Sequence, residues 1–77
     1  MGRQPKQEKD QVVNLVETYR LKRDITRQDL ATLVGVHYQT IGYIERGEYA
    51  PTLALALRLA KALDCTVEEL FTLKVGN

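Results

Sequence analysis

Cysteine, proline, tryptophan and long apolar runs are all scarce in this chain. One cysteine, Cys65, stands among 77 residues, so no internal disulfide can form. No pair of Cys or His residues has the spacing of zinc ligands, and no window approaches the roughly 20 apolar residues that span a bilayer. Two prolines and five glycines are too few for a linker-like polymer. These absences predict an intracellular, metal-free globular protein.

Charge of one sign is not in excess either. Eleven Lys and Arg residues oppose ten Asp and Glu residues, which leaves a net charge of +1. The total therefore does not indicate a nucleic-acid partner, and any electrostatic case must rest on where the charges lie. The length allows one small domain. Because the sequence lacks paired carboxylates, a nucleophile with its base, and a phosphate loop, we expect neither an enzyme nor a cofactor.

Apolar spacing and turn signals divide the chain into three parts. Residues 1–10 are polar and charged around Pro5, which favours a flexible N-terminal arm. Residues 11–72 are expected to form the domain, and residues 73–77 a short tail. At the start of the domain, apolar side chains at helical spacing predict a first helix from about residue 10 to residue 23. These side chains are Val12, Leu15, Val16 and Tyr19.

Four further helices are indicated by capping residues and closing glycines. They are expected over residues 26–35, 37–47, 53–63 and 66–71, with Thr26, Thr52 and Thr66 as N-caps and Gly35 and Gly47 as ends. The helix over 53–63 is so rich in Leu and Ala that we expect it to be almost wholly buried. The predicted fold is all-α, a compact five-helix bundle, and the tail leaves a short C-terminal β segment open.

Two of the predicted helices are joined by a tight glycine turn. Ala31 would let these helices approach closely, and Gly35 would supply the positive φ of the turn. Leu30, Val34, Val36, Ile41 and Ile44 would form the apolar underside of the pair. This is the pattern of a helix-turn-helix, although an ordinary αα-hairpin needs the same glycine and the same underside.

The segment ITRQDLATLVGVHYQTIGYIERGEYAPTLALALRLAKALDCTVEELF, residues 25–71, resembles the phage-repressor type of helix-turn-helix domain, the XRE or Cro/repressor family. Its most specific parts are the Leu30-Ala31 and Gly35-Val36 pairs and the IGYIERG block ending at Gly47. The resemblance implies a lambda-repressor-like DNA-binding domain whose third helix enters the major groove. It also implies a homodimer on a palindromic double-stranded DNA operator, in the cytoplasm of a bacterial, archaeal or phage-infected cell.

The helix over 37–47 carries the candidate base-reading residues. At 100° per residue, His37 and Ile41 should point inward, whereas Gln39, Gly42 and Tyr43 should share the opposite, exposed face with Arg46. The Gln39 amide has the donor and acceptor geometry to pair with adenine in a bidentate manner. The resemblance implies base contacts by Tyr38, Gln39 and Tyr43, with His37 and Thr40 beside them.

A second group of residues is expected to contact DNA phosphates. Arg27 stands where the resemblance implies a phosphate contact, and the family more often has Gln there. Thr26 and Thr52 head helices whose N-terminal amides can bind phosphate. Arg46 and Tyr49 lie beyond the third helix and can reach the sugar-phosphate backbone. For each exposed arginine the alternative is a solvated surface charge.

Three residues have structural interpretations. The resemblance implies an ion pair across the core between Arg20 and Glu45, which would explain an acidic residue on a DNA-facing helix. His37 replaces the Ser or Thr usual at its position, and packing or weak capping is favoured over a pH-sensitive contact. For Cys65, core packing is favoured over redox sensing.

The many leucines near the C-terminus predict a dimer surface, because they occupy more of one helix than a single small core can cover. The candidate interface residues are Leu55, Leu59, Leu70, Phe71, Leu73 and Val75. The alternative is a deep core with a frayed tail.

Two functions fit these observations. The first is a sequence-specific transcriptional regulator, a repressor that occludes a promoter as a dimer. The second is an antitoxin-like protein-interaction module that binds DNA only for autoregulation, for which the chain has little spare length. No small-molecule ligand and no membrane partner is indicated.

Overall fold

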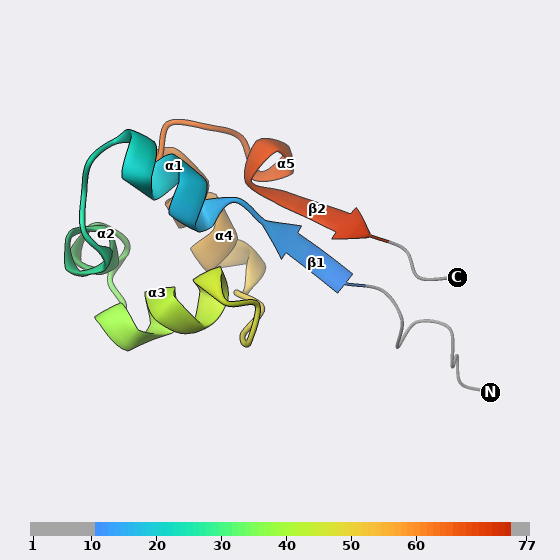
Figure 1. Cartoon of the computed structure of the whole chain (residues 1–77), viewed down its shortest axis with the longest axis horizontal. Helices are drawn as coiled ribbons and strands as arrows, with labels where there is room; N and C mark the ends of the chain where they lie inside the picture. The colour runs from blue at the N-terminus through green and yellow to red at the C-terminus, as the bar shows by residue number, and fades with distance from the viewer. Residues whose placement is uncertain (1–10, 75–77) are drawn as a thin grey trace.

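A computed structural model describes residues 11–74, which form five α-helices and one two-stranded antiparallel sheet (Figure 1). The elements in chain order are β1 (Gln11–Asn14), α1 (Val16–Lys22), α2 (Arg27–Val34), α3 (Tyr38–Glu45), α4 (Leu53–Ala62), α5 (Val67–Leu70) and β2 (Phe71–Lys74). The helical bundle with a short β segment confirms the predicted fold class. The predicted arm, residues 1–10, and the tail residue Val75 lie outside the described residues.

Capping side chains set the starts of three helices, as the sequence predicted. Thr26 Oγ1 accepts from the Asp29 amide at 2.9 Å, and Asp29 Oδ2 accepts from the Thr26 amide at 3.1 Å. Thr66 and Glu69 form the same reciprocal capping box at α5. Thr52 Oγ1 accepts from the Leu55 amide at the start of α4. Because these bonds satisfy amides that have no partner within the helix, they fix where each helix begins.

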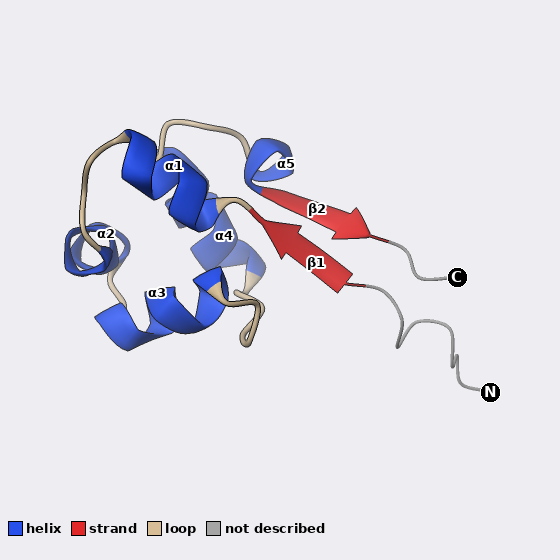
Figure 2. Ribbon diagram, viewed as in Figure 1, coloured by secondary structure: helices blue, strands red, loops and turns tan. Residues whose placement is uncertain are grey.

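Left-handed residues end α2 and reverse the chain after α4. Gly35 has a φ of 79°, which lets its amide bond to the Ala31 carbonyl and turns the chain toward α3 within a few residues. Asp64, with a φ of 57°, takes the same conformation just after α4. Aspartate tolerates this region better than most residues, so a glycine is not required there. Figure 2 shows how short the loop between α2 and α3 is.

The N-terminal part of the predicted first helix is wrong. Residues Gln11–Asn14 are a strand, and α1 begins only at Val16. The strand pairs antiparallel with β2, with Val12 opposite Leu73 and Asn14 opposite Phe71. The helical spacing of the apolar residues did not reveal this pairing, because the partner strand lies at the other end of the domain. The predicted fifth helix likewise ends at Leu70, because Phe71 already belongs to β2.

The core is built from all five helices. Its fully buried members are Val16, Leu30, Ile41, Ile44, Leu59 and Leu70. The half-buried Cys65 packs against this cluster. The expectation that α4 is almost wholly buried is wrong, since Leu53 and Leu57 are exposed. The helix is amphipathic, and only the face with Leu55 and Leu59 meets the core.

Candidate nucleic-acid interface

Helix α3 presents one apolar face to the core and one polar face to solvent. Ile41 and Ile44 are fully buried and fix the helix against α2 and the rest of the bundle. Tyr38, Gln39 and Tyr43 are exposed, and Thr40 is half-buried. The polar face of α3 therefore presents large hydrogen-bonding side chains to solvent, while the apolar face anchors the helix in the core.

The expectation that His37 points inward is wrong. His37 is exposed and is the N-cap of α3, where its Nδ1 accepts from the Gln39 amide at 3.1 Å. Its ring stacks on Tyr38 with centroids 4.6 Å apart. The imidazole thus caps the helix in place of the usual Ser or Thr hydroxyl. Since an Nδ1 that accepts this bond carries no proton, the cap belongs to the neutral ring.

A shallow hollow of about 240 Å³ lies over the exposed face of α3. Six residues line it, namely Arg27, Tyr38, Gln39, Gly42, Tyr43 and Arg46. The structure therefore brings three of the predicted base-reading residues together with two of the predicted phosphate-binding arginines. A second hollow, about 490 Å³, is lined by Thr40, Tyr43, Glu48 and Tyr49 beside it.

The predicted ion pair is present and has a third member that the sequence did not indicate. Arg20 Nε lies 2.7 Å from Glu45 Oε2, and the two side chains are 8% and 1% exposed. Glu45 Oε1 accepts from Arg27 Nε, also at 2.7 Å. Arg20 further donates to the Ile25 carbonyl at 2.9 Å. One buried carboxylate thus ties α1, α2 and α3 together.

Arg27 links this buried carboxylate to the surface. Its hydrogen bond to Glu45, together with the charge of Glu45, raises the pKa of the Arg27 guanidinium above its ordinary value. The Arg27 side chain is 43% exposed, and its Nη2 lies 3.9 Å from the exposed carboxylate of Glu17. The guanidinium is therefore charged, with Nε held by Glu45 and Nη2 near Glu17. No sequence pattern indicated the contact between Arg27 and Glu45.

Gly42 is buried beneath the side chain of Arg46, which corrects its expected place on the exposed face. A Cβ at Gly42 would lie 3.1 Å from Arg46 Nη1 and 3.8 Å from Cζ. The guanidinium also lies over the Tyr43 ring, with Cζ 5.2 Å from the centroid. Arg46 Nε is 3.3 Å from Glu48 Oε1. The side chain thus folds back along α3.

The remaining candidates for phosphate contact differ in how free they are. The hydroxyls of Thr26 and Thr52 already accept from helix amides, and the Thr26 amide donates to Asp29. A phosphate contact at these two helix starts therefore falls to the backbone N–H groups of the first helical residues. Tyr49 is exposed in the loop after α3. Its ring borders the second hollow, next to Tyr43.

Two polar residues that the sequence did not single out hold α3 and α2 in place. Asn14 donates to the Ile44 carbonyl at 2.9 Å and accepts from the Val16 amide at 3.1 Å, so it joins β1, α1 and the end of α3. Arg58 Nε donates to the Val34 carbonyl at 3.1 Å. Ile44 is 30 residues from Asn14 and Val34 is 24 residues from Arg58, so only the tertiary structure reveals these two partners.

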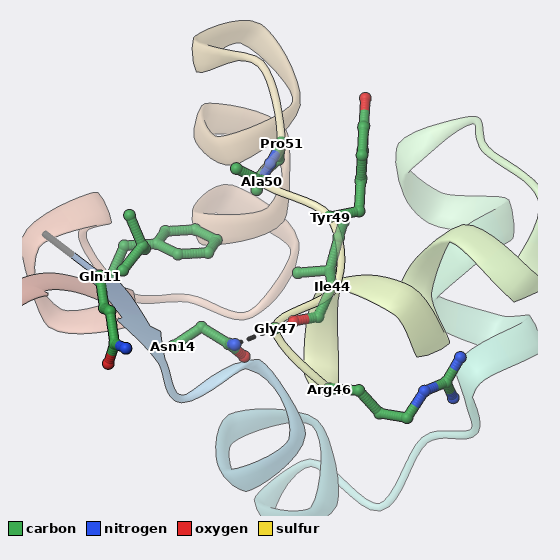
Figure 3. Close-up of a pocket in the computed structure, with 10 residues that line it drawn as sticks. Gln11, Asn14, Ile44, Arg46, Gly47, Tyr49, Ala50 and Pro51 are labelled. Atoms are coloured by element: carbon green, nitrogen blue, oxygen red, sulfur yellow. Dashed lines mark hydrogen bonds between the residues drawn. The ribbon is translucent and has the colours of Figure 1, made fainter. Parts of the chain in front are cut away.

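Figure 3 shows the cleft that Asn14 borders, between β1 and the loop after α3. Its volume is about 550 Å³, and its wall includes Phe71 and Pro51. Arg46 lines both this cleft and the hollow over the exposed face of α3, and its side chain runs along α3 away from Asn14 (Figure 3).

The expected dimer residues divide by burial. Leu55, Leu59 and Leu70 are at most 4% exposed, so the chain's own core uses them and a second chain cannot reach them. This corrects their expected place in an interface. Phe71 is half-buried, and Leu73 is 59% exposed. Val75 lies outside the described residues.

Within residues 11–74, no group of three or more His, Cys, Asp and Glu side chains is arranged to hold a metal ion. In the same part of the chain, no helix is long and apolar enough to cross a membrane.

Known proteins resemble this chain in sequence and in structure. A family model described as helix-turn-helix matches residues 16–70. An HTH-type transcriptional regulator of Methanocaldococcus jannaschii is 41% identical over 58 residues, which are 75% of this chain and 88% of that protein.

Two solved structures share the fold. The restriction-modification controller protein C.AhdI of Aeromonas hydrophila has a TM-score of 0.69 and 34% identity, over 73% of this chain and 85% of that one. The P22 c2 repressor, solved with a synthetic operator, has a TM-score of 0.67 and 34% identity, over 69% and 80%. The chain belongs to the helix-turn-helix family of DNA-binding transcriptional regulators and is not an enzyme.

Proposed function

We propose that the protein represses transcription by binding a two-fold symmetric operator as a homodimer, with α3 in the major groove of double-stranded DNA. The observation that carries this proposal is the exposed row on α3, where Gln39 lies between Tyr38 and Tyr43 on a helix held rigidly by the core. The similarity to a repressor solved with its operator supports DNA as the partner.

Base reading is assigned to the side chains that start on the first two turns of α3. Gln39 presents an amide that can bond adenine N6 and N7, and each tyrosine can offer its hydroxyl and lay its ring against a thymine methyl. His37 and Thr40 lie beside this row, where His37 also caps the helix. Because the cap leaves the ring outside the core, His37 can approach a base or a phosphate through Nε2.

Phosphate contacts are assigned to the two ends of the helix pair. Arg27 is oriented by the buried Glu45, and its side chain is 43% exposed, so its Nη groups can meet a phosphate with less loss of side-chain freedom than a mobile arginine would suffer. The exposed Glu17, 3.9 Å from Nη2, is the partner that a phosphate would replace. The amides at the starts of α2 and α4, after Thr26 and Thr52, and the Tyr49 hydroxyl can contact the backbone on either side. Arg46 provides a further positive charge on this face.

Dimerisation is assigned to the two-stranded sheet. Val12, Val13 and Leu73 are about half exposed on this ribbon, and both of its edges are free of further strands among the described residues. A two-stranded ribbon is marginal in water by itself, and a second copy would cover its apolar side chains. One surface meeting its own copy gives the two-fold symmetry that a palindromic operator requires.

Selection of bound duplexes from a random DNA pool tests this function. The native chain should enrich one sequence with two-fold symmetry, and the affinity for it should fall as salt is raised because phosphate contacts release counterions. A pool that shows no enrichment after repeated rounds would overturn sequence-specific binding. Enrichment of a site without symmetry would overturn the dimer and leave the reading helix.

A further inference from the structure

Arg46 differs from the other arginines of the interface in how its side chain is held. It starts just past the end of α3 but folds back over the preceding turn, so that its guanidinium lies against the backbone of Gly42. A Cβ at position 42 would lie 3.1 Å from Nη1, so the guanidinium would have to shift by a few tenths of an ångström to make room for it. Glycine at this position thus lets the guanidinium lie close to the backbone of α3.

Two further contacts fix the orientation of the guanidinium. The guanidinium carbon, Cζ, lies 5.2 Å from the centroid of the Tyr43 ring, within the range of a cation–π contact. Glu48 Oε1 lies 3.3 Å from Nε. Among the described residues, Nη1 and Nη2 have no hydrogen-bond acceptor of their own. The two outer nitrogens are therefore the part of the fork left for a ligand.

The position of this fork is that of a base reader. The guanidinium borders the same hollow as Gln39 and Tyr43, over the exposed face of α3 and not beyond its end. Two parallel N–H donors match guanine O6 and N7 in the major groove, which is the commonest specific contact that arginine makes.

We infer that Arg46 reads a guanine and that Gly42 and Glu48 are the residues that position it. This inference rests on the proposed function, because it assigns a base to a residue of the proposed reading surface. It moves Arg46 from the phosphate contacts, where the sequence had suggested it, to the specificity-determining residues. It also gives Gly42 a reason to stand within a helix, where glycine is otherwise unfavourable.

The test compares the duplex selected by the native chain with versions in which each G·C pair is replaced. Arg46→Lys keeps the charge but loses the planar fork, so discrimination at one G·C pair should fall about tenfold or more while the salt dependence is retained. Gly42→Ala alters no charge and favours the helix, yet it should lose discrimination at the same pair. Lys61→Ala, on the exposed part of α4, is the control for removing a positive charge, and it should retain the base preference.

Three results are decisive. Loss at the same G·C pair in Arg46→Lys and Gly42→Ala, with both variants folded by circular dichroism, supports the inference. If Gly42→Ala reads every base pair as the native chain does, and Arg46→Ala weakens all duplexes equally, Arg46 is a phosphate anchor and the inference is overturned. If the native chain enriches no duplex, the proposed function fails and this inference fails with it.

Discussion

Arg27 Nε donates to Glu45 Oε1 at 2.7 Å, so a carboxylate that is only 1% exposed holds an arginine of the proposed DNA-binding surface. The second oxygen of the same carboxylate accepts from Arg20 Nε. Glu45 thus both stabilises the fold and positions an arginine of the proposed DNA-binding surface. The position of Arg27 relative to α3 depends on an ion pair whose other half lies in the core.

Replacing Glu45 should destabilise the domain strongly. In Glu45→Gln the buried Arg20 loses its closest counter-charge and keeps only the exposed carboxylate of Glu17, 4.0 Å from Nη2. Breaking a buried pair by removing one partner costs about 3 to 5 kcal/mol. The free energy of unfolding can be measured by urea denaturation followed by circular dichroism. Glu48→Gln is the matched control, because Glu48 is 56% exposed and an exposed pair contributes about 0 to 1 kcal/mol. Equal losses in the two variants would show that the Glu45 network does not stabilise the fold.

Removing Arg27, the partly exposed partner of Glu45, should affect DNA binding more than folding. Arg27→Ala leaves Glu45 paired with Arg20, so the domain should remain folded. Its affinity should fall for all duplexes alike, and the slope of log K against log salt should become shallower by about one. Fluorescence anisotropy at several salt concentrations measures this slope. An unchanged slope would remove Arg27 from the phosphate contacts.

The ribbon of β1 and β2 offers a test of the dimer. Leu73 is exposed on β2, and Leu73→Glu would place a charge where we propose that a second copy packs. Sedimentation velocity over a range of concentrations should show a dimer for the native chain and a monomer for this variant. Leu33→Glu, at a similarly exposed leucine on α2, should remain dimeric. Dissociation by both variants, or by neither, would place the interface elsewhere.

Cys65 should be a slow nucleophile in the folded protein. Burial raises the pKa of its thiol, and the negative charges of Glu69 and Asp64 raise it further. The folded state therefore favours the neutral thiol. The stability that this preference contributes is fully present below the pKa of the thiol in the unfolded chain. It is lost as pH rises through the pKa of the thiol in the folded protein. Alkylation by iodoacetamide at pH 8 should be slower in the native chain than in urea, and equal rates would contradict this environment.

The parts of the structure that the sequence predicted are those with local signals. Thr26 with Asp29 and Thr66 with Glu69 are three residues apart, and each pair forms a capping box. The φ of Gly35 also follows from its own chemistry. By contrast, the partner of Val12 is Leu73, at the far end of the domain, so local spacing suggested a helix where a strand forms.

The candidate site follows the same division. Helical periodicity predicts the exposure of Gln39 and Tyr43, whereas Tyr38 was indicated only by the resemblance to the family. Periodicity gives only the direction of each Cα–Cβ bond. It could not predict that the long Arg46 side chain folds back over Gly42. The contact of Arg27 with Glu45 and the bond from Asn14 to the Ile44 carbonyl were also missed. They depend on how separate elements pack, which no short motif encodes.

Gln39 gives the sharpest test of the proposal that the exposed face of α3 reads DNA bases. Affinities of the native chain and of Gln39→Ala should be measured for the selected duplex and for each of its single base-pair replacements. We expect the variant to lose about 1 to 3 kcal/mol of discrimination at one or two A·T pairs while its salt dependence stays native. A Gln39→Ala chain that discriminates every base pair as well as the native chain would show that Gln39 does not read a base.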